Sequence, residues 1–167
     1  MAVGSIYNVE MLIDAWVTDL RGISIVNGYK TDFSKVEMPS WSFEDDSRIT
    51  AQDDATLLVW LDEDRGGQER SNSSEDRPEL SMAVVGIFKR ERDLQMAMLR
   101  AVHDIRRVAR GNPQRNHPEN TALVNTWGVD TELDAFNMAV HRTAQASTIG
   151  VFSGTVRLRY RCPRGTG

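Results

Sequence analysis

The chain has 167 residues, of which 40% are hydrophobic and 26% are charged, and these fractions exclude an intrinsically disordered protein. A chain of this length fits one domain, which buries roughly 68–70% of the surface that the unfolded chain exposes. The net charge of −4 is too small to predict a nucleic-acid or membrane binder from the overall field alone. We therefore expect a single domain over residues 1–167.

The first predicted element is an amphipathic helix that begins at Ser5, a residue suited to the N-cap position. Its apolar residues recur every three or four positions and so share one face. They are Val9, Leu12, Ile13, Trp16, Val17, Leu20 and Ile23. Gly22 costs a helix about 1 kcal/mol relative to alanine, but the periodicity favours a helix that continues to Val26. Asn27 and Gly28 tolerate a positive φ and so predict its end.

Strands are predicted after this helix. A short strand over 29–38 is followed by the polar, acidic stretch 40–54, which we interpret as a loop or an edge strand. The run 55–61 is apolar throughout, as expected for a central strand that is covered on both faces. This strand should pair with 80–88, the next apolar run of strand length.

The segment 63–79 between these two strands has the composition of a projecting arm. It contains Gly66 and Gly67, a polar run from Ser71 to Ser74, and charges of both signs. The segment is too long for a tight turn. We therefore expect a flexible arm or an extended hairpin tip.

A second amphipathic helix is predicted over 90–110, with Gly111 as its C-terminal stop. Its buried stripe is expected to consist of Leu94, Met98, Ala101, Val102, Ile105, Val108 and Ala109. The segment 121–144 is ambiguous, because 122–129 alternates weakly like a strand and 135–140 fits either state.

The last predicted element is a strand over 150–162, in which apolar and basic residues alternate. Val156, Leu158 and Tyr160 should form its buried face. Together the elements predict an α/β (α+β) fold, a two-layer sandwich. Its sheet has four to five strands, mixed or antiparallel, and two main helices pack on one face.

The sequence lacks the common motifs of catalytic, cofactor and metal sites. The histidines His103, His117 and His141 do not have the spacing of zinc ligands. The acidic stretches at 44–46, 53–54 and 62–64 lack the ligand order of a calcium loop, and we interpret them as solvated loops. We therefore expect no catalytic residue, no cofactor and no metal, and a protein that is not an enzyme.

Two groups of basic residues are candidates for contacts with another subunit or partner. The first group lies on the second helix and consists of Arg100, His103, Arg107 and Arg110. Steps of three and four residues place these side chains on one stripe. The second group lies on the wet face of the last strand and consists of Arg157, Arg159 and Arg161. Guanidinium groups bind carboxylates and phosphates in bidentate fashion, but both groups also fit an ordinary solvated surface.

Two stretches resemble the tail terminator proteins of long-tailed bacteriophages, the group that includes minor tail protein U. One is 25–32, with the sequence IVNGYKTD, which follows a helix and is similar to the family's Asn-Gly-Tyr and Thr-Asp signature. The signature residues are Asn27, Gly28, Tyr29, Thr31 and Asp32. The other is the Val-x-Leu-x-Tyr-Arg strand at 156–161. The elements between the two stretches come in a similar order.

The resemblance implies a structural virion protein without a cofactor. It would form a homohexameric ring that caps the tail tube, ends its elongation and joins the tail to the head at the neck. The implied partners are other copies of the chain, the tail tube protein and a neck or head-completion protein, with DNA passing through the lumen. The implied location is the virion, after assembly in the host cytoplasm. The lone Cys162 and the lack of a secretory signal or of about 18 consecutive apolar residues agree with this location.

Other functions remain open. Another neck ring, such as a head-completion or tail-completion protein, fits the same observations. A small nucleic-acid-binding module would use the arginines of the second helix and would lose DNA affinity steeply with salt. An enzyme with a metal held by loop carboxylates, Asp62 among them, would be stabilised by divalent cations.

Overall fold

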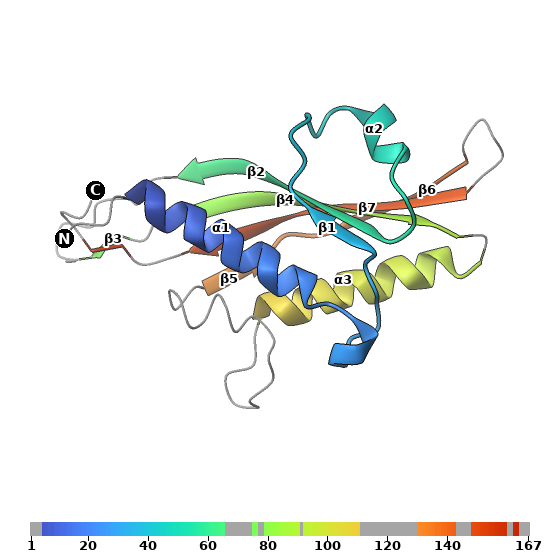
Figure 1. The fold of residues 1–167 in the computed structure, drawn as a ribbon, viewed down its shortest axis with the longest axis horizontal. Helices are drawn as coiled ribbons and strands as arrows, with labels where there is room; N and C mark the ends of the chain where they lie inside the picture. The colour runs from blue at the N-terminus through green and yellow to red at the C-terminus, as the bar shows by residue number, and fades with distance from the viewer. Residues whose placement is uncertain are drawn as a thin grey trace.

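The structure, a computed structural model, describes residues 5–65, 75–76, 79–90, 92–110, 130–142, 148–159 and 162–163. Over these residues the chain forms a two-layer α/β (α+β) sandwich (Figure 1). Helices α1 (Ser5–Arg21) and α3 (Leu94–Arg110) cover one face of a mixed sheet, which confirms the predicted fold class.

The strand order of the sheet is β1-β2-β4-β7-β5, and β6 also pairs with β7. The strands are β1 (Lys35–Glu37), β2 (Thr56–Arg65), β4 (Glu79–Lys89), β5 (Asp130–Leu133), β6 (Asn137–Arg142) and β7 (Thr148–Arg159). β1 runs parallel to β2, and the other pairs are antiparallel. Because β5 and β6 follow one another along the same edge of β7, the described sheet is five strands across.

The main core lies between the sheet and the two long helices. All seven residues of the predicted α3 stripe are buried, and Leu12, Trp16 and Leu20 of α1 are fully buried beside them. Alternate residues of the central strands β4 and β7 face this core. Gly86 is needed on β4 because a Cβ atom there would lie 2.0 Å from the ring of Phe152 on β7.

A smaller core covers part of the opposite face, which we call the second face of the sheet. Ile49 of the short helix α2 (Asp46–Thr50) packs there on Leu58, Val85 and other apolar residues of the sheet. Leu57 and Val59 belong to the main core, so β2 is covered on both faces, as predicted from its apolar run. The predicted pairing of this run with the next strand is also confirmed.

The first helix ends earlier than predicted. Ser5 is its first residue and not its N-cap, and Arg21, not Val26, is its last. The amide of Gly22 already donates to two carbonyl oxygens of the preceding turn, and the chain then forms the short 3-10 turn η1 (Ile25–Asn27). The apolar pattern extends past the end of the helix only to Ile23, because Ile25 and Val26 are exposed.

Two further predictions about the first half of the chain hold only in part. Only β1 forms a strand within 29–38, because the backbone amide of Lys30 bonds to the side chain of Asp104 and Asp32 bonds to the amide of Ile25, so this stretch does not pair with a neighbouring strand. The stretch 40–54 contains the helix α2, which begins after Asp45 as its N-cap. A single buried apolar residue in five left no periodic pattern that would predict this helix.

In the second half of the chain, the structure assigns part of the segments that the sequence left ambiguous. α3 begins at Leu94 and not at residue 90, and 135–140 belongs mainly to β6. Of the predicted arm, the first residues continue β2, and β3 (Glu75–Asp76) pairs with β8 (Cys162–Pro163). The rest of the arm at 66–74 and 77–78, the predicted stop Gly111 and the weak strand at 122–129 lie outside the described residues.

Candidate interaction surfaces

The signature segment ties the end of α1 to α3. Gly28 has a φ of 85° and ends the turn η1, and its carbonyl oxygen accepts a hydrogen bond of 2.8 Å from Nη1 of Arg107. The Arg107 guanidinium also lies 4.6 Å from the ring centroid of Tyr29, which is buried. Asn27 donates from its side chain to the carbonyl oxygen of Gly22 at 2.8 Å.

A buried carboxylate completes this attachment. Asp104 is fully buried on the apolar side of α3, and its Oδ2 accepts a 2.9 Å hydrogen bond from the backbone amide of Lys30. Asp32 accepts a 2.7 Å bond from the backbone amide of Ile25, which closes the turn. Thr31 is buried, and no hydrogen bond forms to its hydroxyl within the described residues. The signature residues therefore hold the fold together at this point.

The outer side of α3 carries an exposed stripe that combines apolar and basic side chains. We call it the α3 outer face, and its residues are Met96, Leu99, Arg100 and His103. Their spacing of i, i+3, i+4 and i+7 places them in one row along the helix. Met96 and Leu99 are each 47% exposed and lie next to one another on the helix, so they form a small apolar patch.

The predicted basic stripe of this helix is therefore only partly on the surface. Arg100 and His103 point outward, whereas Arg107 is half-buried against Gly28 and Tyr29. The side chain of Arg110 lies outside the described residues.

The basic group on the last strand is also partly engaged within the chain. Arg157 forms a 3.0 Å ion pair with Asp134 and lies 4.0 Å from a carboxylate oxygen of Glu79, so it joins β7 to its neighbours on both sides. The side chain of Arg159 and the whole of Arg161 are outside the described part of the chain. A contact of this group with a partner stays a prediction.

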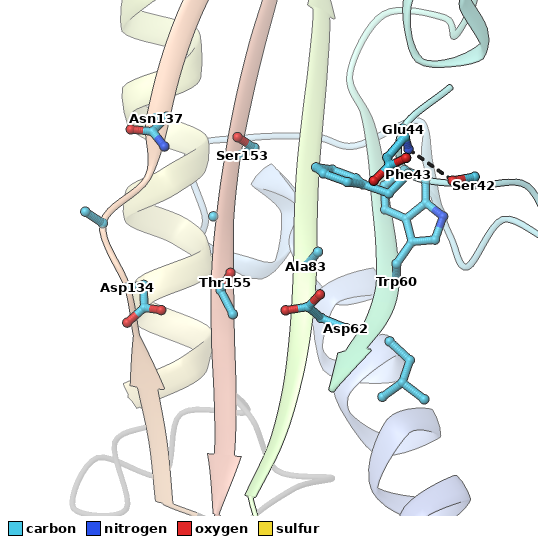
Figure 2. Close-up of a pocket in the computed structure, with 13 residues that line it drawn as sticks. Ser42, Phe43, Glu44, Trp60, Asp62, Ala83, Asp134, Asn137, Ser153 and Thr155 are labelled. Carbon is cyan, nitrogen blue, oxygen red and sulfur yellow. Dashed lines mark hydrogen bonds between the residues drawn. The ribbon is translucent and has the colours of Figure 1, made fainter. Parts of the chain in front are cut away.

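A groove of about 610 Å³ lies on the second face of the sheet. Figure 2 shows its floor, which consists of the small residues Ala83 on β4 and Ser153 and Thr155 on β7. Phe43 and Trp60 stand on the β2 side, and Asp134 and Asn137 line the opposite side. A second hollow of about 820 Å³ continues the groove toward α2, since the two share Phe43, Glu44 and Ser153. We call the first hollow the second-face groove.

The aromatic wall of this groove is held in place by its own contacts. The indole nitrogen of Trp60 donates a 2.9 Å hydrogen bond to the carbonyl oxygen of Trp41. The rings of Trp41 and Phe43 meet Trp60 edge to face, with centroids 5.3 and 5.2 Å away. Phe43 is 42% exposed at the rim, so the wall offers apolar surface in a fixed arrangement.

The groove is also acidic. Glu44, Asp62 and Asp134 line it, and no lysine or arginine does. Asp134 is paired with Arg157, but neither Glu44 nor Asp62 takes part in an ion pair within the residues that the structure describes. Glu44 and Asp62 belong to stretches that the sequence predicts to be solvated loops. The groove could not be predicted, because its walls come from segments far apart in the chain.

The other acidic and histidine candidates have local roles or lie apart. Asp45 caps α2, and Asp54 accepts hydrogen bonds from the backbone of Lys89 and the side chain of Arg90. His141 is exposed on β6, and His117 is not among the described residues. Within the described ranges no three potential metal ligands come together, and no helix is long and apolar enough to cross a membrane.

The α3 outer face and the second-face groove lie on opposite sides of the sheet, because α3 covers the first face and the groove opens on the second (Figures 1 and 2). One surface is basic and the other acidic, and both expose large apolar side chains. No protein-family model matches this chain, and no curated protein sequence does either. These two surfaces are thus the features on which a functional assignment can be based.

Proposed function

We propose that the protein is the tail terminator of a long-tailed bacteriophage. In this proposal its copies form a closed homohexameric ring that caps the tail tube, ends tube elongation and joins the tail to the head at the neck. The resemblance of 25–32 and 156–161 to that family suggests the identity. The observation that carries the proposal is the pair of unlike, oppositely charged surfaces on opposite sides of one sheet. A ring of identical subunits needs two such surfaces, since each contact joins one patch to a different patch of the next copy.

The proposal includes a set of partners and a location. The ring contacts the tail tube protein on one side and a neck or head-completion protein on the other, and DNA passes through its lumen. The protein acts in the virion after assembly in the host cytoplasm, and it turns over no substrate and needs no cofactor.

The test is the assembly state of the purified chain, alone and with tail tubes built from the tube protein encoded by the same genome. Analytical ultracentrifugation should show a closed oligomer of six subunits, either alone or after the tubes are added. Electron microscopy should show a ring at one end of each tube, and capped tubes should stop growing when more tube protein is supplied. A strict monomer that ignores the tubes would contradict the proposal. A ring that binds only purified heads would instead identify another neck ring.

The exposed Arg100 and His103 favour a second candidate, a small nucleic-acid-binding module. Fluorescence anisotropy with a duplex DNA probe separates the two. This candidate requires affinity that falls steeply with salt and is lost in Arg100→Glu.

A further inference from the structure

The second-face groove lies over neighbouring strands of the sheet. Its floor is formed by β4 and β7, and β2 and β6 flank these strands, so three strand spacings of about 4.8 Å separate the axes of β2 and β6 by about 14 Å. An α-helix with its side chains is about 10–12 Å across. The floor residues Ala83, Ser153 and Thr155 are small, which leaves room for the larger side chains of a helix.

Among the described residues, no helix covers this part of the sheet. There α1 and α3 cover the first face, whereas on the second face Ile49 of α2 packs on Val85 and its neighbours. The sheet is antiparallel apart from the β1–β2 pair, and in a sheet of this kind one face can stay in contact with water. An additional helix in the groove would complete a second layer beside α2.

The residues that line the groove determine which side chains a helix bound there must carry. Trp60 and Phe43 offer fixed apolar surface, and Glu44 and Asp62 also line the groove. A helix that fits must therefore present apolar side chains and cations in one row. Aromatic faces at the wall would also attract a guanidinium group.

The α3 outer face is a row of this kind. Met96 and Leu99 supply the apolar side chains, and Arg100 and His103 supply the basic ones, all on two successive turns of one helix. Within its own chain this row points away from the sheet, because the opposite side of α3 is packed in the main core. It cannot reach the groove of the same copy, which opens on the other face.

We propose that the α3 outer face of one copy docks in the second-face groove of the next copy. Each subunit then uses its groove on one side and its helix on the other, a head-to-tail contact that closes into a ring when the rotation per subunit divides a full turn. The apolar side chains supply affinity, and the pairing of Arg100 with Asp62 or Glu44 sets the register. This inference rests on the proposed ring function and names the interface that the ring would use.

The test uses two charge reversals in the full chain, Asp62→Arg in the groove and Arg100→Glu on α3. Each variant alone should assemble at a concentration at least about tenfold higher than the wild type, because one like-charged contact is created at every interface. An equimolar mixture should assemble at close to the wild-type concentration. In a ring of alternating copies, the α3 outer face of each Arg100→Glu copy meets the groove of an Asp62→Arg copy, so the two reversed charges pair. The α3 outer face of each Asp62→Arg copy, which keeps Arg100, meets the groove of an Arg100→Glu copy, which keeps Asp62. Sedimentation velocity measures all four samples.

The matched control is Asp14→Arg, the same charge change at an exposed position of α1. It should assemble like the wild type, and circular dichroism should show that all three variants keep the wild-type melting temperature. The milder pair Asp62→Asn and Arg100→Gln repeats the experiment if a reversal prevents folding.

The outcomes separate this interface from the ring function itself. Wild-type rings together with normal assembly of both reversals would overturn the interface and leave the ring intact. Single defects that the mixture fails to repair would also overturn it. If Asp62→Arg forms rings but no longer attaches to tubes or heads, the groove holds a partner protein and not a second copy. A wild-type chain that stays monomeric with and without tubes would overturn both proposals.

Discussion

Arg107 connects two segments that are 79 residues apart in the sequence, through its hydrogen bond to Gly28 and its position over the ring of Tyr29. Replacing it by alanine removes both contacts from a site next to the main core. We expect Arg107→Ala to lower the free energy of unfolding by about 2–4 kcal/mol, the sum of one hydrogen bond to a charged donor and one cation–π contact. Urea unfolding followed by circular dichroism measures this change.

Arg100→Ala is the matched control, since Arg100 lies on the same helix but is exposed. Its effect on monomer stability should stay within about 0.5 kcal/mol of zero. Equal effects of the two variants would show that the contacts of Arg107 do not stabilise the fold.

At the same scale, helical spacing predicted that Arg100 and His103 of α3 lie on its exposed side. It could not predict that Arg107 turns inward, because its partner Gly28 is brought near only by the tertiary fold. Nor could it predict Asp104, since a buried acid among apolar residues runs against the pattern that identifies a core stripe. The groove residues Phe43 and Ser153 are remote in sequence and carry no shared motif.

The short helix α2 depends on its N-cap. Ser47 donates a 2.6 Å hydrogen bond to the Asp45 carboxylate, and this bond lowers the pKa of Asp45 below its ordinary value of 3.8, with smaller contributions from Arg48. Because the pKa is lower in the folded state, the cap stabilises α2 at pH values above the ordinary pKa. That contribution is lost as the pH falls through the folded-state value.

We therefore expect the protection factors of the α2 amide protons, which are corrected for the pH dependence of intrinsic exchange, to fall as the solution is acidified below about pH 4, where an ordinary aspartate begins to be protonated. Asp45→Ala should show low protection factors already at neutral pH and little further change on acidification. Hydrogen exchange and the carboxyl titration, both followed by NMR, test this. An Asp45 that titrates at or above its ordinary pKa would contradict the account.

Elements with strong periodicity could be predicted from the sequence, and elements without it could not. The stripe of α3 and the pairing of β2 with β4 followed from their apolar patterns. β6 stayed ambiguous because all six of its residues are exposed, so no alternation marks a buried side. β1 has only three residues, and its position is set by a parallel pairing with β2. No local sequence pattern predicts such a pairing.

At the scale of the whole molecule, the α3 outer face and the second-face groove are the two surfaces that the proposed assembly would use. An isolated copy leaves Phe43 exposed at the groove and Met96 and Leu99 exposed on α3. Mutual burial of these side chains between copies would remove both apolar surfaces from water at once. The charges around them oppose one another in sign, which favours contacts between unlike surfaces over contacts between like ones.

This arrangement predicts how salt acts on assembly. Raising the ionic strength from about 0.1 M to about 1 M shortens the Debye length from about 10 Å to about 3 Å, so the attraction between Arg100 of one copy and Asp62 of the next is screened during approach. We expect ring assembly to slow by about tenfold or more, while finished rings persist because their apolar contacts are not screened. Stopped-flow light scattering gives the rate, and sedimentation after dilution gives the persistence. The double variant Asp62→Asn with Arg100→Gln removes the charge pair and should assemble slowly at every salt concentration. A wild-type rate that does not change with salt, or a double variant as salt-sensitive as the wild type, would place the steering charges elsewhere on the molecule.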